Sequence, residues 1–275
     1  MAIRYPRWRQ DRSASTGREV SGAVWDPFVR YAALYGHGTK AGSDFDGTTV
    51  TVATTAITIT DGLKGYTSSG GTVVGTTEPT GAFKFTDDND DNDETYIVAG
   101  DNAHAPFAFD PTDLSQMVGF ETRVRITSAA LTETGFLAGF CVPGCMAANT
   151  LADDTGVIAD NKNFIGFHAA QTASGDLVVK GVHKDGTEGV VTSQASLHTF
   201  VKDAWVKLGF LLDPREKKIV WVVNGKIVGE NILADLDDVP DDEAWTPIIG
   251  IKNLEAVAKS FECSFLHAEL FSHVM

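Results

Sequence analysis

Residues 205–230, WVKLGFLLDPREKKIVWVVNGKIVGE, carry an alternation of apolar side chains that restricts the fold more than any other feature of the chain. Val206, Leu208, Phe210 and Leu212 occupy every second position, and the alternation resumes after the charged turn DPREKK. A period of two places such side chains on one face of a β-strand. The Asn-Gly dipeptide that follows favours a type I′ turn. The stretch therefore predicts a meander of three antiparallel strands.

Segments of the same kind recur from residue 94 onward and are separated by turn residues. They include ETYIVAG, VGFETRVRIT, TGFLAGFCV, NFIGFHAA, GDLVVKGVH and SFECSFLHAELFS. Many short strands at regular spacing, with almost no helical period, are typical of an antiparallel β-sandwich or jelly roll. A length of 275 residues is compatible with one such sandwich. The predicted fold class is an all-β jelly roll with an extended N-terminal arm and one short helix.

The predicted helix covers residues 26–36, DPFVRYAALYG. Asp26 is a suitable N-cap, Pro27 suits the first helical position, and Gly36 suits the position after the helix. Residues 37–82 are rich in Thr, Gly and Val, which favours short strands at a sheet edge or a subunit contact, with a poorly folded linker as the alternative. The predicted organisation is an arm and helix over 1–36, a Thr/Gly-rich β segment over 37–82 and a sandwich over 83–275.

Charge is distributed unevenly along the chain. The net charge is −15, but residues 1–18 hold five arginines and one aspartate, which gives +4 there and −19 elsewhere. An acidic body disfavours direct binding of nucleic acid. The basic arm is either a solvated terminus or a contact segment for acidic partners, including sister copies. Its interleaved aromatic residues favour contact. The candidate binding residues are Arg4, Tyr5, Arg7, Trp8, Arg9, Arg12 and Trp25.

Two acidic runs are candidate cation or glycan loops. Residues 86–95 read TDDNDDNDET, and residues 234–245 read ADLDDVPDDEAW. Oxygen ligands of this kind suit calcium, but an EF-hand loop counted from Asp87 has Asn92 at its sixth position and Val98 at its twelfth, where glycine and glutamate are required. A solvated loop and a cation site both remain open, and the second run is equally a candidate acidic target for the arginine arm of a neighbouring copy.

The residue patterns of common enzymes are not found. Glu121 stands alone on its strand, without the carboxylate pair of a glycanase, and an ion pair with Arg123 or Arg125 is expected. His168 and His267 lie in apolar strands and are expected to be structural. Cys141, Cys145 and Cys263 lack zinc spacing and are expected to be small buried residues in a protein made in a reducing cytoplasm. No signal peptide or membrane span is predicted, and neither an enzymatic activity nor a cofactor is expected.

Two stretches resemble known families. WVKLGF at 205–210 and IVWVVNGK at 219–226, with SFECSFLHAELFS as the final strand, resemble the concanavalin A-like or laminin G-like jelly roll over residues 83–275. This resemblance implies the fold and leaves the function open, because lectins, hydrolases and structural modules share it.

The segment from FKFTDDNDDNDETYIV to GFETRVRIT resembles virion structural proteins of tailed bacteriophages, with Thr122 where that pattern has alanine. The resemblance implies a capsid decoration (cement) protein, made in the host bacterial cytoplasm and located on the virion surface. Its expected partners are the major capsid protein and sister subunits in a homo-oligomer. The alternative is a carbohydrate-binding tail fibre, spike or head-fibre module that binds a host glycan.

Overall fold

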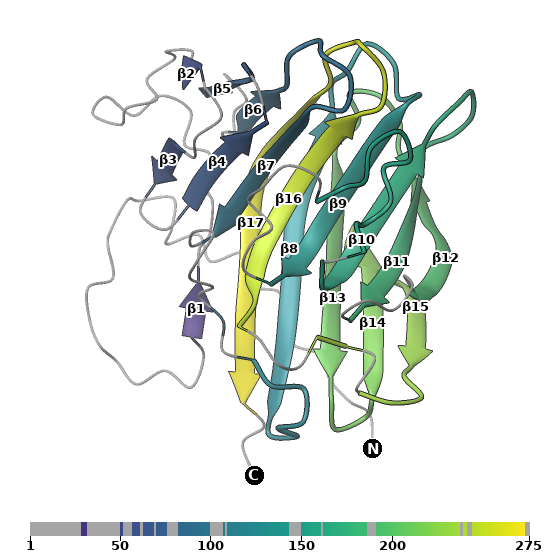
Figure 1. Cartoon of the computed structure of the whole chain (residues 1–275). Helices are drawn as coiled ribbons and strands as arrows, with labels where there is room; N and C mark the ends of the chain where they lie inside the picture. The colour runs from purple at the N-terminus through teal and green to yellow at the C-terminus, as the bar shows by residue number, and fades with distance from the viewer. Residues whose placement is uncertain are drawn as a thin grey trace.

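A computed structural model shows two antiparallel β-sheets that face each other as a sandwich (Figure 1). The structure describes residues 29–31, 50–51, 57–60, 63–68, 70–75, 82–99, 107, 109–142, 150–160, 162–185, 191–236, 239–240 and 244–272. None of these residues forms a helix, and accordingly the described part of the chain has no helix that would cross a membrane. The predicted all-β jelly-roll class is confirmed.

Each sheet is assembled from strands that are distant in sequence. The first sheet has nine strands: β15 (Lys226–Ile232), β14 (Lys218–Val223), β13 (Val206–Asp213), β8 (Gln116–Ile126), β17 (Ser260–Ser272), β6 (Phe83–Thr86), β5 (Thr72–Gly75) and β2 (Val50–Thr51) in spatial order, with β1 (Val29–Tyr31) also paired to β17. The second has eight: β12 (Val191–Thr199), β11 (Val178–Lys184), β10 (Phe164–Gln171), β9 (Thr134–Cys141), β16 (Thr246–Asn253), β7 (Glu94–Ala99), β4 (Leu63–Thr67) and β3 (Ile57–Thr60).

Aromatic side chains fill the space between the sheets. Phe120, Phe210 and Trp221 come from the nine-stranded sheet, whereas Phe140 and Phe167 come from the eight-stranded sheet, and all five are buried. The ring centroids of Phe210 and Trp221 lie 5.4 Å apart, and those of Phe167 and Trp221 lie 5.2 Å apart. The alternation that predicted one buried face per strand is therefore the pattern that builds this core.

The meander predicted over residues 205–230 is confirmed as β13, β14 and β15. Phe210 pairs with Trp221, and both side chains enter the core. Asn224 and Gly225 have φ angles of 50° and 77°, as the predicted tight turn requires. The short charged turn before β14 is closed by Asp213, whose carboxylate accepts a hydrogen bond from the Arg215 N–H at 3.0 Å.

The predicted helix over 26–36 is wrong at the residues that the structure describes. Val29–Tyr31 form β1, in which Val29 pairs with Leu270 and Tyr31 with Ala268. On the same side of β17, β6 pairs only with Ser260–Cys263. Further along that edge β1 takes the place of β6 and pairs with Ala268, Glu269 and Leu270, and these backbone hydrogen bonds outweigh the local capping signals. Asp26, Pro27 and Gly36 lie outside the described residues.

The described strands of the Thr/Gly-rich segment extend both sheets at one side of the sandwich (Figure 1). β5 pairs with β6 and β2 pairs with β5 in the nine-stranded sheet. β4 pairs with β7 and β3 pairs with β4 in the eight-stranded sheet. These strands thus lie at a sheet edge, as their composition favours, while the boundaries at 36 and 82 stay predictions.

The cysteines differ from the expectation that all three are buried thiols. Cys141, the last residue of β9, takes part in a disulfide bond. Cys263 is free and buried, and its burial raises the pKa of the thiol to about 12. A disulfide is a covalent link that the apolar surroundings of a cysteine do not reveal, so composition alone did not predict it.

Candidate functional site

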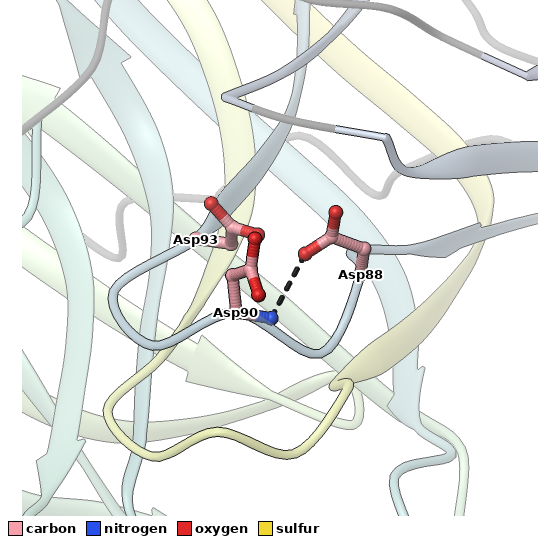
Figure 2. Close-up of side chains that lie close together, drawn as sticks. All are labelled: Asp88, Asp90 and Asp93. Carbon is pink, nitrogen blue, oxygen red and sulfur yellow. Dashed lines mark hydrogen bonds between the residues drawn. The ribbon is translucent and has the colours of Figure 1, made fainter.

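Three aspartates converge in the loop between β6 and β7. One carboxylate oxygen from each of Asp88, Asp90 and Asp93 lies within 4.8 Å of the other two (Figure 2). The Asp90 N–H donates a hydrogen bond of 2.9 Å to Asp88 Oδ1, which tightens the turn. Asp93 is buried, Asp88 is half-buried and Asp90 is exposed, so the cluster reaches from the protein interior to solvent.

Neighbouring segments hold this loop in place. The Gly70 N–H donates to Asp88 Oδ2 at 3.2 Å, and the Ser68 hydroxyl donates to Asp93 Oδ1 at 3.0 Å. From the other side, the side-chain amide of Asn253 donates to the carbonyl oxygen of Asp90 at 2.7 Å. The loop is thus fixed by groups that lie between 18 and 163 residues away.

A second acidic turn lies against the first. The Asn92 amide donates to Asp154 Oδ1 at 3.0 Å, and the Asp154 N–H donates to Asn92 Oδ1 at 2.8 Å. This reciprocal pair brings the exposed residues Asp153 and Asp154 beside the loop. We call the group of Asp88, Asp90, Asp91, Asp153 and Asp154 the acidic end.

Asp87 lies beneath the acidic end as a buried carboxyl group. Its Oδ1 accepts a hydrogen bond from the Lys259 N–H, while Oδ2 has no hydrogen-bond partner among the described residues. Burial, strengthened by the nearby charges of Asp93 and Asp88, raises the pKa of Asp87 to about 9. The carboxyl group is therefore protonated at neutral pH in the folded protein.

Carboxylate oxygens arranged in this way suit a hard cation such as Ca²⁺, which takes six to eight oxygen ligands in proteins. The cluster brings one carboxylate oxygen from each of three residues together, so a bound Ca²⁺ would need further oxygens from the same carboxylates, the backbone or water. Exposed acidic groups also repel one another when they are only solvated. The geometry is compatible with both interpretations of this acidic run.

Asp90→Asn separates these two interpretations. Removing one of three converging negative charges is expected to raise the melting temperature in chelator-containing buffer. The corresponding gain in the free energy of unfolding is expected to be at most about 1 kcal/mol. The readout is thermal unfolding with and without Ca²⁺, and Asp91→Asn in the same loop is the matched control. A Ca²⁺-dependent stabilisation that Asp90→Asn abolishes identifies a cation site, whereas equal melting with and without Ca²⁺ identifies a solvated loop.

A buried ion pair lies on the outer face of the eight-stranded sheet, next to the acidic end. Lys252 on β16 and Glu94 on β7 are both fully buried, with Nζ and Oε1 3.2 Å apart. Lys252 also reaches Asp153 at 2.6 Å and donates to the Leu151 carbonyl oxygen at 2.9 Å. The pair therefore ties the 150–156 turn to the sheet. No sequence signal identified it, because 158 residues separate its members.

The outer face of the nine-stranded sheet holds a different set of charges. Glu121 pairs with Lys207 on the adjacent strand at 2.7 Å, so the expected pairing with Arg123 or Arg125 is wrong. Arg125 instead binds Glu262 at 2.7 Å. Glu262 lies directly opposite Arg125, whereas Lys207 lies diagonally across from Glu121, whose directly opposite residue on β13 is Gly209 and has no side chain to offer.

The predicted structural histidine at 168 is confirmed. His168 Nε2 lies 2.8 Å from the Gly156 carbonyl oxygen, and burial lowers the pKa of the ring. His267 lies 3.5 Å from a carboxylate oxygen of Glu269 on the same strand. In the second acidic run, the backbone N–H of Leu236 donates a hydrogen bond of 2.7 Å to Asp235 Oδ1. Neither this bond nor the contact between His267 and Glu269 indicates a catalytic role.

The candidate contact residues of the arm lie outside the described residues. These are Arg4, Tyr5, Arg7, Trp8, Arg9, Arg12 and Trp25. The structure does not test their role, so the arm's contacts stay a prediction.

The sequence matches no protein-family model and no curated relative. Among solved structures, the fold is similar to that of peanut lectin, with 13% identity and a TM-score of 0.53 over 83% of this chain and 100% of the lectin chain. It is also similar to the metal-free carbohydrate recognition domain of Emp46p, with 12% identity and a TM-score of 0.51 over 78% of this chain and 90% of that domain.

A third similar structure is a protein of unknown function from Shewanella oneidensis MR-1, with 9% identity and a TM-score of 0.53 over 82% of this chain and 85% of that protein. Identities this low establish shape and do not establish shared chemistry. The two sheets, their antiparallel register and these likenesses together show that the chain folds as a jelly-roll β-sandwich similar in shape to these proteins.

Proposed function

We propose that this protein is a non-enzymatic capsid decoration (cement) protein of a phage virion, attached through its basic N-terminal arm. The observation that carries the proposal is the separation of charge. The arm has a net charge of +4 over residues 1–18, whereas the sandwich gathers exposed carboxylates at its acidic end. Opposite charges at two places on one chain favour contacts between copies and with acidic neighbours.

In this mechanism the sandwich acts as a rigid body and the arm as a tether. Arg4, Arg7, Arg9 and Arg12 pair with carboxylates of the major capsid protein or of a sister subunit. Tyr5, Trp8 and Trp25 are the apolar anchors of the contact. Each single contact is weak, but several contacts on one virion surface add up through multivalency. The mechanism requires neither a cofactor nor a catalytic residue.

Deleting residues 1–18 is expected to abolish capsid binding while the sandwich keeps its melting temperature. The measurement is co-sedimentation of the full and truncated chains with purified capsids at low and high salt. Binding of the full chain is expected to weaken as salt rises, because exposed ion pairs are screened over about 10 Å at 0.1 M salt. Changing Arg4, Arg7, Arg9 and Arg12 to lysine is the matched control that keeps the charge. Equal binding by the truncated chain contradicts the proposal.

The second candidate is a glycan-binding fibre or spike module, which the fold favours. Two of the similar structures are a lectin and a carbohydrate recognition domain by name. In this alternative, loop carboxylates and exposed aromatic side chains hold a host sugar. A glycan array probed with the full chain distinguishes the two. Binding to a defined glycan that survives deletion of residues 1–18, without capsid binding, supports the fibre module.

A further inference from the structure

The loop that carries Asp88, Asp90 and Asp93 crosses from one sheet to the other. It follows β6 in the nine-stranded sheet and leads into β7 in the eight-stranded sheet. The connection from β16 to β17 makes the opposite crossing, and it begins after Asn253, the last residue of β16. The side-chain amide of Asn253 donates to the carbonyl oxygens of Asp88 at 3.3 Å and Asp90 at 2.7 Å. The two crossings between the sheets therefore meet at one amide group.

The oxygen atom of this amide is a buried acceptor that the protein leaves unused. Asn253 is fully buried, and its Oδ1 has no hydrogen-bond partner among the described residues. An amide oxygen only accepts hydrogen bonds. The loop that the amide enters presents acceptors as well, namely the carbonyl oxygens of Asp88 and Asp90 and the converging carboxylates. A buried acceptor among other acceptors is satisfied by a donor or a cation from outside the chain.

Strand register places the Asn253 side chain beside the aspartates. Lys252 pairs with Glu94, and the Asn253 N–H donates to the Asp93 carbonyl oxygen at 2.9 Å, so Asn253 and Asp93 are the next pair along the two strands. Side chains of opposite residues share a face of the sheet. This is the inner face, because Ile251, two positions before Asn253, belongs to the main core. The unused oxygen thus belongs to a side chain next to the buried aspartate of the cluster.

The spacing of the three carboxylates fits a single calcium ion. One oxygen from each of Asp88, Asp90 and Asp93 lies within 4.8 Å of the other two, and Figure 2 shows the three side chains gathered inside the loop. Two ligands of one Ca²⁺, each about 2.4 Å from the ion, lie at most about 4.8 Å apart. Ca²⁺ takes carboxylate, amide and carbonyl oxygens together, whereas Mg²⁺ needs a strict octahedron and keeps several waters. The mixed set of oxygens here therefore favours Ca²⁺.

We propose that Asp88, Asp90, Asp93 and Asn253 bind one Ca²⁺ through their side-chain oxygens, with water completing the coordination. The ion joins the two crossings between the sheets and offsets part of the negative charge of the acidic end. The unused Asn253 oxygen distinguishes this site from an acidic run that is only solvated. Neither the arm nor a capsid takes part in the site, so it stands or fails separately from the proposed function.

Calorimetric titration of the full chain with Ca²⁺ tests the site. The protein is first treated with chelator and then dialysed into chelator-free buffer with excess Mg²⁺, which suppresses nonspecific attraction to carboxylates. The wild type is expected to bind Ca²⁺ at a single saturable site. Asp90→Asn is expected to weaken binding at least ~10-fold, which corresponds to about 1.4 kcal/mol. Asp91→Asn is the matched control, because Asp91 is exposed in the same loop and is not a proposed ligand, and it should bind like the wild type.

Asn253→Asp tests the amide oxygen itself. The variant keeps an oxygen ligand and gives it charge, but it loses the N–H groups that hold the loop. It is expected to melt at a lower temperature than the wild type in chelator and to show a larger rise in melting temperature when Ca²⁺ is added. Asn92→Asp is the control, because it adds the same charge to the same loop and also loses an amide hydrogen bond, to Asp154.

Three results overturn the proposal: a wild-type chain that does not bind Ca²⁺, equal weakening by Asp90→Asn and Asp91→Asn, or a Ca²⁺-induced rise in melting temperature that is no larger for Asn253→Asp than for Asn92→Asp. The first would show that water alone satisfies the Asn253 oxygen, and the second would show attraction to the general negative charge of the loop. The titration with Asp90→Asn decides the case by itself if Asn253→Asp does not fold.

Discussion

Lys252→Met is expected to lower the free energy of unfolding at neutral pH by about 3–5 kcal/mol, a large effect for one side chain. Lys252 is fully buried and contacts the Glu94 carboxylate, Asp153 and the Leu151 carbonyl oxygen. Methionine has a similar length and keeps the packing. It removes the cation that contacts Glu94 Oε1, so the carboxylate stays buried with weaker charge compensation, and this accounts for most of the loss.

The loss is expected to depend on pH. Burial raises the pKa of Glu94, whereas Lys252 lowers it. Removing Lys252 therefore moves this pKa further above the value in the unfolded chain. A raised folded-state pKa gives stability at low pH that is lost as pH rises through it. The deficit of Lys252→Met should thus be small near about pH 4 and largest above neutrality, as urea unfolding across this range would show.

Two further variants distinguish the contribution of the ion pair to stability from the contribution of side-chain packing. Adding Glu94→Gln to Lys252→Met removes the stranded charge and is expected to recover a substantial part of the lost stability. Lys217→Met is the surface control, because Lys217 and Asp235 lie 3.8 Å apart with both side chains about half exposed. Its effect should stay within about 1 kcal/mol. A Lys252→Met protein as stable as the wild type would contradict the buried pair as a structural support.

Asp87→Asn is expected to make the folded protein more stable than the wild type at alkaline pH, by several kcal/mol at most. The pKa of Asp87 rises from 3.8 to about 9 on folding because the carboxyl group is buried. The wild type therefore loses stability as pH rises from about 4 to about 9, since unfolding releases the proton that the folded state retains. Each unit of this shift corresponds to about 1.4 kcal/mol before relaxation of the site.

The measurement is the free energy of unfolding of both proteins as a function of pH. Asparagine resembles the protonated carboxyl group in shape, so the two proteins should differ least near about pH 4 and diverge steadily toward pH 9. Asp91→Asn, on the exposed side of the same loop, is the control and should not reproduce this divergence. Parallel curves for the wild type and Asp87→Asn would show that the carboxyl group is charged in the folded protein.

The sandwich was predictable because its signals are local. Alternation in the meander, together with Asn224 and Gly225 at the turn, specifies strands and a turn without reference to the rest of the chain. The candidate site was less predictable. The acidic loop was visible as a run of aspartates, but its contacts with Gly70, Asn253 and Asp154 arise only after the strands have assembled.

The two wrong predictions, the helix at 26–36 and the ion-pair partner of Glu121, have the same physical origin. Local capping residues favoured a helix at 26–36, whereas the open edge of β17 recruits Val29–Tyr31 as a strand. Local spacing favoured an arginine partner for Glu121, whereas the adjacent strand supplies Lys207. In both cases a partner distant in sequence outcompetes a nearby one, which single-sequence patterns do not encode.

The position of β17 also has a consequence for the order in which the molecule folds. This strand is the last of the described strands to be synthesised, yet it lies inside the nine-stranded sheet, between β8 on one side and β6 and β1 on the other. Closing these contacts joins residues that are far apart in sequence, from 135 positions for Phe261 with Ile126 to 241 positions for Val29 with Leu270, and such long loops slow folding. The emerging chain therefore exposes two unfinished sheet edges until β17 arrives, and a chaperone that shields them during synthesis would favour correct closure over aggregation.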